Sequence, residues 1–267
     1  MKFSRTLPSQ SLARYELKFL IPDSMIKPIA DYISSYCSLD HYSAAEKDGF
    51  YQVNSLYFDT PQFFFLRNRL SGSEKRINMR IRSYGRNPSP PYFLEVKNKI
   101  VSVMRKYRAS IHEDLFVNKP EYFEYHPSDI SNREEIHNIQ IFNYLKDIYN
   151  AQPKVLTQYH RLAYFSEFEE YSRVTFDREL KYMVEDLYNV TPDPSLMMPC
   201  DFPELIDDGS NVILEMKCYT SHVPFWMIDC IRNFNLHRTS FSKYAVSIFH
   251  VMDQFHPSLL DHFPAGA

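Results

Sequence analysis

The stretch YELKF, at Tyr15–Phe19, carries a pattern that returns as FLEVK at Phe93–Lys97 and as ILEMK at Ile213–Lys217. In each copy a Glu and a Lys lie two residues apart, and apolar residues occupy the alternating positions. Side chains alternate between the two faces of a β-strand, so residues two apart share a face. The three couplets therefore predict strands of a sheet with one charged face and one apolar face.

Length and composition are those of a globular protein. The chain has 267 residues, of which 44% are hydrophobic and 24% charged, and its formal net charge is -3. This size suits a single domain spanning residues 1–267. The charge argues against a protein that coats nucleic acid.

Several kinds of site and segment are excluded by the sequence. The 5 glycines form neither GxGxxG nor GxxxxGK, so side chains rather than a glycine-rich loop would have to bind phosphate. The 4 cysteines contain no CxxC pair, which favours buried free thiols over a zinc site. Because there is no signal-peptide pattern and no run of about 18 apolar residues, we expect a cytoplasmic protein without a transmembrane segment.

Strand-like alternation occurs in about eight segments, with helical candidates between them. The expected strands are Tyr15–Ile21, Tyr51–Phe58, Ile77–Tyr84, Tyr92–Lys99, Val103–Ile111, Val155–Phe165, Ser172–Asp177 and Val212–Tyr219. The expected helices are Asp23–Tyr36, Pro61–Leu70, Arg133–Tyr149, Val223–Phe234 and Ser242–Met252. This order predicts an α+β fold, mostly antiparallel β with helices packed outside.

Cations recur at alternating positions of the expected strands. Arg80 shares a face with Arg82, and Lys106 shares one with Arg108. One interpretation is the solvent-exposed face of an ordinary antiparallel sheet. The strand centres are almost purely Arg, Lys and Glu, however, and amphipathic helices can cover the apolar side. The charged side can then line a closed barrel, which about eight antiparallel strands can form.

A barrel lined in this way predicts its own ligand. Many cations and several carboxylates would be costly to bury without a partner, which implies a polyanion together with a metal. Lys and Arg bind phosphate oxygens, and carboxylates on the same wall suit Mg²⁺ or Mn²⁺. A triphosphate or a short polyphosphate meets both requirements.

These strands resemble the VTC domain, the catalytic part of a complex that makes polyphosphate, within the triphosphate tunnel metalloenzyme superfamily. The matching stretches are RYELKFLIP (Arg14–Pro22), SLYFDT (Ser55–Thr60), MRIRSY (Met79–Tyr84), FLEVKNK (Phe93–Lys99), RKYRASI (Arg105–Ile111), YHRLAY (Tyr159–Tyr164), SRVTFDREL (Ser172–Leu180), ILEMK (Ile213–Lys217) and FSKY (Phe241–Tyr244). They cover most of the chain in order and are specific jointly. The resemblance implies an eight-stranded antiparallel β-barrel tunnel with helices packed outside.

The resemblance also implies roles for individual residues. The phosphate-binding set would be Lys18, Arg80, Arg82, Lys97, Lys106, Arg108, Arg161, Arg173 and Lys243. The catalytic residues would be Arg80, Arg82, Lys97, Arg161, Arg173 and Lys243. Glu215 would be the principal ligand of Mn²⁺ or Mg²⁺, with Glu16 and Glu95 as helpers. Lys243 falls at an expected helix start, where backbone N–H groups can also face an anion.

Three functions stay open at this point. The first is a polyphosphate polymerase that transfers the terminal phosphate of ATP to a growing chain, and SLYFDT and FSKY favour it. The second is a triphosphatase acting on nucleoside or inorganic triphosphate. The third is a non-catalytic polyphosphate-binding module, which has little need of Glu215 among cations. The expected partners are ATP or another triphosphate and inorganic polyphosphate, without nucleic acid; a membrane-protein partner is also compatible with the family.

Overall fold

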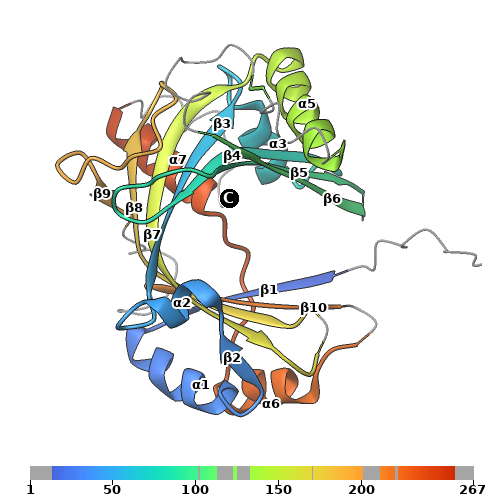
Figure 1. Ribbon diagram of the computed structural model, residues 1–267, viewed down its shortest axis with the longest axis vertical. Coiled ribbons are helices and arrows are strands. Elements are labelled where there is room, and N and C mark those ends of the chain that lie inside the picture. Colours follow the sequence, from blue (N-terminus) through green and yellow to red (C-terminus); the bar gives the residue numbers. More distant parts are fainter. Residues whose placement is uncertain are drawn as a thin grey trace, which may run out of the picture. The chain divides into compact units, whose positions relative to one another are not determined.

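The computed structural model describes residues 14–101, 103–112, 123–124, 133–169, 171–200, 211–219 and 222–255. The strands are β1 (Arg14–Ile21), β2 (Cys37–Leu39), β3 (Tyr51–Asp59), β4 (Lys75–Tyr84), β5 (Tyr92–Ile100), β6 (Val103–Ile111), β7 (Gln152–Ser166), β8 (Arg173–Val184), β9 (Met198–Pro199) and β10 (Val212–Tyr219). The helices are the 3₁₀ turn η1 (Asp23–Met25), α1 (Ile26–Ile33), α2 (His41–Ala45), α3 (Phe64–Leu70), α5 (Arg133–Ile148), α6 (Phe225–Asn233) and α7 (Lys243–Phe255). Figure 1 shows these elements.

Within the described ranges, eight strands form one path of hydrogen-bonded neighbours, in the order β1-β10-β8-β7-β3-β4-β5-β6. Antiparallel pairings join β10 to β1 and β8, β3 to β7 and β4, and β5 to β4 and β6. The short strands β2 and β9 pair with β7 and β8, respectively. The expected α+β class with an antiparallel sheet and helices is confirmed.

The chain divides into two compact units, and each takes its described residues from three stretches. Unit 1 lies within Met1–Gly49, Leu162–Asp177 and Pro203–Ser240. Unit 2 lies within Phe50–Arg161, Arg178–Phe202 and Phe241–Ala267. Strands β7 and β8 each contribute residues to both units. The expectation of a single domain stays a prediction.

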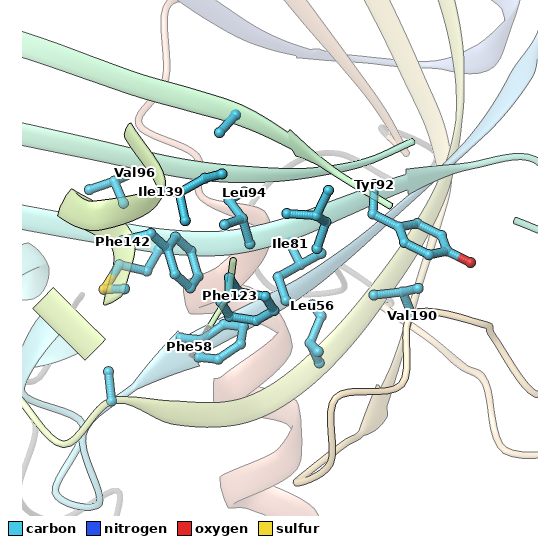
Figure 2. Close-up of a cluster of buried hydrophobic side chains, with 14 of the residues drawn as sticks. Leu56, Phe58, Ile81, Tyr92, Leu94, Val96, Phe123, Ile139, Phe142 and Val190 are labelled. Carbon is cyan, nitrogen blue, oxygen red and sulfur yellow. The ribbon is translucent and has the colours of Figure 1, made fainter. Parts of the chain in front are cut away.

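Unit 2 buries an apolar core on one face of strands β3 to β6, beneath α5 (Figure 2). The strands contribute Leu56, Phe58, Met79, Ile81, Leu94, Val96, Ala109 and Ile111. Phe142 of α5 is fully buried and meets the ring of Phe58 edge-on, with 5.5 Å between ring centroids. Because side chains alternate along each strand, burial of this face directs the residues between them to the opposite face. The expected cover of the apolar face by an amphipathic helix is therefore found here.

Unit 1 has its own apolar face and helices. Phe19, Leu214 and Phe176 occupy neighbouring positions on β1, β10 and β8, and each is at most 2% exposed. Helices α1 and α6 contact each other, and the ring of Tyr36, which follows α1, stacks on Trp226 of α6 with 5.6 Å between ring centroids. The charged residues of β1 and β10 alternate with this apolar set and share the opposite face.

The start of α3 differs from the expected element. The sequence predicts a helix from Pro61, whereas α3 begins at Phe64, because Phe63 adopts the left-handed conformation with φ of 55°. The Asp59 carboxylate accepts hydrogen bonds from the backbone N–H groups of Phe65 and Leu66, each at 2.9 Å. Thr60 also caps this turn, since its hydroxyl oxygen accepts from the N–H of Phe64. The Asp-Thr pair therefore satisfies the N–H groups that the first helical turn leaves free.

The remaining differences are small. Strand β8 continues to Val184, and β2, β9 and α2 were not expected, because they are too short to show a period in the sequence. The Pro- and Asp-rich sequence at 191–208 predicts a surface loop, and part of this range lies outside the described residues. None of the described helices is both long and apolar enough to cross a membrane.

Candidate functional site

The charged face of unit 2 is built by the register of four strands. Tyr57 of β3 lies opposite Arg80 of β4, Arg80 lies opposite Glu95 of β5, and Glu95 lies opposite Arg108 of β6. Residues two positions along share this face, which adds Arg82 and the facing pair Lys97 and Lys106. The cations that the sequence places on separate strands are thus neighbours.

Glu95 is the centre of this arrangement, and its side chain is only 1% exposed. Arg80 donates to its Oε2 from Nε at 2.8 Å and from Nη2 at 2.6 Å. Arg82 lies 3.9 Å from the same oxygen. Lys106 and Arg108 approach Oε1 at 3.2 Å and 3.6 Å, as ion pairs without hydrogen-bond geometry. One buried carboxylate therefore holds four cations, and this group, which we call the Glu95 cluster, carries excess positive charge.

The pKa values follow from this charge imbalance. Burial alone would raise the pKa of Glu95, but Arg82, Arg80 and Lys106 outweigh it and hold the pKa well below its usual value. Burial and the neighbouring arginines have the opposite consequence for Lys106: they outweigh the attraction of Glu95 and lower its pKa to about 8. Glu95 is therefore ionised near neutral pH, whereas Lys106 loses its proton as the pH rises through about 8.

Lys243 and Tyr57 belong to the same charged region of unit 2. Lys243 is the first residue of α7, one position after the expected helix start at Ser242, and its Nζ lies 4.5 Å from the centroid of the Tyr159 ring. Tyr57 is 4% exposed, and its hydroxyl oxygen accepts a hydrogen bond from Arg80 at 3.2 Å. Burial raises the pKa of Tyr57, but Arg80, Lys243 and Arg82 outweigh burial and lower it overall. The phenol therefore lies within the influence of three cations, and sequence reasoning had assigned it no role.

Two motifs distant in the sequence meet through a hydrogen bond. The Tyr244 hydroxyl of FSKY donates to Oδ2 of Asp59 in SLYFDT at 2.5 Å. Both side chains are buried, and the Tyr57 and Tyr244 rings lie 5.3 Å apart. Since Asp59 also caps α3, this bond fixes the first turn of α7, and with it Lys243, against β3. In the sequence, these two motifs are linked only because both resemble stretches of the VTC domain.

Unit 1 carries a different charged group. Glu16 and Lys18 of β1 face Lys217 and Glu215 of β10, so each carboxylate lies opposite an ammonium group. The Lys18 Nζ lies 3.5 Å from both Glu16 Oε1 and Glu215 Oε2, and the Lys217 Nζ lies 2.5 Å from Glu215 Oε1. Arg173 of β8 lies opposite Lys217 and is exposed. We call Glu16, Lys18, Glu215 and Lys217 the Glu215 cluster; Lys217 was absent from the predicted phosphate-binding set, although its alternation with Glu215 places it on the same face.

Comparison with known families identifies the chain. A family model described as the VTC domain matches residues 13–252. The chain belongs to the VTC domain family. No curated protein sequence matches it.

Solved structures similar to this VTC domain share little sequence with it. An adenylate cyclase candidate from Bacillus halodurans has a TM-score of 0.47 and 9% identity, and the match covers 91% of this chain and 99% of the other. An adenylate cyclase candidate from Vibrio parahaemolyticus has a TM-score of 0.44 and 12% identity, with 89% and 98% covered. A protein from Pyrococcus horikoshii OT3 has a TM-score of 0.42 and 11% identity, with 89% and 99% covered.

The predicted cations of this VTC domain are distributed unequally between the units. Seven of the nine lie in unit 2: Arg80, Arg82, Lys97, Lys106, Arg108, Arg161 and Lys243. Among them, Arg161 has its guanidinium carbon 5.3 Å from the centroid of the Tyr159 ring. Lys18 and Arg173 lie in unit 1. The roles of all nine stay predictions.

The predicted metal ligands are divided in the same way. Within the described ranges, no three His, Cys, Asp or Glu side chains form a group that could hold a metal ion by themselves. Glu16 and Glu215 nevertheless converge on one point, the Lys18 ammonium. Because Mg²⁺ is often bound by one or two carboxylates together with substrate phosphates, this pair could hold a divalent ion in exchange for its contacts with Lys18. Glu95 fits one poorly, since four cations already surround it.

Proposed function

We propose that this VTC domain is a metal-dependent phosphotransferase that transfers the terminal phosphate of ATP to the end of a polyphosphate chain. The observation that carries the proposal is the Glu95 cluster, in which four cations share one carboxylate. Keeping four cations close together costs free energy because they repel one another, and an additional bound anion offsets that cost. Membership of the VTC domain family supports a phosphate chain as that anion.

The residues of unit 2 would bind and orient the phosphates. Arg82 and Lys106 each have one anionic partner in the Glu95 cluster and further donors that can reach phosphate oxygens. Lys243 would add a charge at the N-terminus of α7, where backbone N–H groups also favour an anion. Phosphoryl transfer depends mainly on positioning and charge neutralisation, which such a set of side chains supplies.

The reaction itself needs no covalent enzyme intermediate. A terminal oxygen of the polyphosphate chain would attack the γ-phosphorus of ATP, and the bond to the β-phosphate oxygen would break, so that ADP leaves with the bonding electrons. In unit 1, Glu215 and Glu16 would hold Mn²⁺ or Mg²⁺, with Lys18 and Lys217 next to them. A bound divalent ion would neutralise charge on phosphate oxygens.

Hydrolysis is the second candidate reaction. The Glu16 side chain is 30% exposed, so its carboxylate can accept a proton from water, as a general base would. Water would then replace the polyphosphate chain as the attacking group, and inorganic phosphate would be released. The Glu95 carboxylate is less suited to this task, because it is buried among cations that lower its pKa.

Product analysis tests the proposal directly. The purified chain would be incubated with ATP and Mn²⁺, while ADP, free phosphate and acid-stable polyphosphate are followed over time. The matched variants are Arg82→Gln, within the Glu95 cluster, and Lys75→Gln, an exposed cation at the start of the same strand. We expect polyphosphate and ADP from the wild type and from Lys75→Gln, and at least about 100-fold less from Arg82→Gln, the size found when a group that stabilises transition-state charge is removed.

The other outcomes would favour one of the two alternative functions. Free phosphate without chains would contradict polymerisation and favour the triphosphatase. ATP binding without either product would favour a binding module.

A further inference from the structure

Aromatic rings extend the charged face of unit 2 beyond its cations. Phe93 lies between the core residues Tyr92 and Leu94 on β5, so its ring points to the charged face. Tyr84 shares that face of β4 with Arg82, and Tyr51 lies on the corresponding face of β3. All three rings are half-buried, so each keeps some surface open to solvent.

The rings and one cation lie in contact with one another. The centroids of Tyr51 and Tyr84 are 6.2 Å apart, and those of Tyr84 and Phe93 are 5.8 Å apart. The guanidinium carbon of Arg108 lies 4.0 Å from the centroid of Phe93. The Arg108 side chain is 41% exposed, so one side of its guanidinium covers Phe93 while part of the group stays accessible. We call Tyr51, Tyr84, Phe93 and Arg108 the aromatic platform.

The platform adjoins the residues that would bind phosphate. Phe93 lies directly opposite Arg82, and Tyr51 lies directly opposite Arg161. Phe93 is also two residues from Glu95 on the same face of β5, a step of roughly 7 Å along a strand. A triphosphate held by the Glu95 cluster would therefore have flat, partly exposed groups within the reach of an attached nucleoside.

We propose that the aromatic platform is the subsite for the nucleobase of the triphosphate: the base stacks on the Arg108 guanidinium, which Phe93 supports from below, and Tyr84, whose ring is inclined by 71° to that of Phe93, contacts its edge. The inference rests on the proposed function, because it names the part of the substrate that polyphosphate lacks. Bases stack on aromatic rings and on Arg planes, whereas a bare phosphate chain has no flat group to stack. The platform thus distinguishes a nucleotide from polyphosphate on a face that binds the phosphates of both.

Binding measurements with two ligands test the subsite. ATP and tripolyphosphate would be titrated into the wild type and into Phe93→Leu and Tyr84→Leu, with Tyr144→Leu on α5 as the exposed control. Loss of one ring of the platform should weaken ATP binding about tenfold, within the range found for aromatic substitutions at base-stacking sites. Tripolyphosphate affinity should stay within about twofold in both variants, because no base is present, and Tyr144→Leu should change neither affinity.

A wild-type experiment avoids dependence on variants that fail to fold. The triphosphate of 2-aminopurine riboside should lose fluorescence on binding, since stacking quenches this base, and tripolyphosphate should restore the signal by displacement. An unquenched, bound probe would overturn the subsite.

The variants give outcomes of their own. Equal loss of ATP and tripolyphosphate affinity, or no loss of either, would overturn the subsite and leave the proposed function standing. A wild type that binds neither ligand would overturn the proposed function together with the subsite.

Discussion

The two charged clusters use similar side chains in opposite proportions. The Glu95 cluster of unit 2 has four cations around one carboxylate that is 1% exposed. The Glu215 cluster of unit 1 alternates two carboxylates with two lysines, and its members range from 6% to 30% exposed. An excess of cations around one buried carboxylate suits an anion, whereas alternating carboxylates and lysines would suit a metal ion that replaces a lysine contact.

The contrast teaches that a charged strand face is not a single kind of site. All three Glu–Lys couplets have the same spacing in the sequence, yet Glu95 is distinguished by its neighbours on β4 and β6. The chemistry of a couplet therefore depends on what the adjacent strands place opposite it. Each prediction below tests one part of this contrast.

The largest effect is expected for Glu95→Gln. Removing the charge leaves Arg80, Arg82, Lys106 and Arg108 without their shared anion, and breaking a buried ion pair typically costs about 3–5 kcal/mol. Chemical denaturation should show a loss of this size in the free energy of unfolding. Glu179→Gln is the control, since its side chain is 55% exposed and a loss below about 1 kcal/mol is expected. Added tripolyphosphate should stabilise Glu95→Gln more than the wild type, because it supplies the missing negative charge.

Equal stability of Glu95→Gln and Glu179→Gln would break the comparison, because the buried carboxylate would then have no special role. If Glu95→Gln is destabilised and tripolyphosphate does not restore its stability, the four cations do not bind an added anion.

Glu215→Gln should affect turnover rather than phosphate binding. If Glu215 holds the metal as proposed, its loss removes several kcal/mol of transition-state stabilisation, so Mn²⁺-dependent turnover should fall by at least about 100-fold. Tripolyphosphate affinity measured without metal should stay equal or increase, because one negative charge is lost. Lys217→Gln is the matched change on the same strand, and it should weaken tripolyphosphate binding instead. Unchanged turnover in Glu215→Gln would remove the metal role from unit 1.

Tyr244→Phe tests another buried carboxylate of unit 2, Asp59. Burial raises the pKa of Asp59, despite the hydrogen bonds it receives from Tyr244 and from the backbone, whereas cations lower the pKa of Glu95. Removing the hydroxyl should lower the free energy of unfolding by about 1.5–3 kcal/mol, the range for a hydrogen bond to a charged group. The control is Tyr182→Phe, which removes a hydroxyl that donates to Gln254 at 3.4 Å, and it should lower the free energy of unfolding by less. A larger loss in Tyr182→Phe would contradict the importance of the Asp59–Tyr244 bond.

The smallest effect concerns pH. The pKa of Lys106 is lowered to about 8, so the free protein carries this charge below pH 8 and loses it as the pH rises. A polyanion prefers the protonated form and raises the pKa in the complex, so tripolyphosphate affinity should fall a few-fold above about pH 8. Lys106→Arg keeps its charge over this pH range. Ionisation of the ligand affects both proteins equally, so the ratio of wild-type to variant affinity reports only on Lys106. A ratio that does not change with pH would exclude titration of Lys106.

Much of this architecture follows from local patterns. The expected strands all occur, because alternation with β-branched and aromatic residues is retained along each of them, and α5 covers an apolar face, as the sequence predicts for an amphipathic helix. Register does not follow from alternation. The sequence could place Glu95 on a charged face but could not show that four cations meet there, or that Tyr57 accepts a bond from Arg80.

The predicted start of α3 was wrong for a related reason. The sequence Thr60-Pro61 is a good helix start in isolation, but Phe63 is left-handed, and the N–H groups of the first turn of α3 bond to Asp59, which also accepts from Tyr244. The partner in that interaction lies 185 positions away in the chain, so no local pattern contains it.

The origin of the two clusters in the chain has a consequence for folding. All five charged members of the Glu95 cluster come from the consecutive strands β4, β5 and β6, within Lys75–Ile111. The Glu215 cluster instead requires β1 to meet β10, which follows it by almost the whole described length of the chain. Contacts between neighbours in sequence form faster than distant ones. During synthesis the meander of β4, β5 and β6 can assemble while the ribosome is still translating, whereas the carboxylates of unit 1 must wait for β10 to emerge.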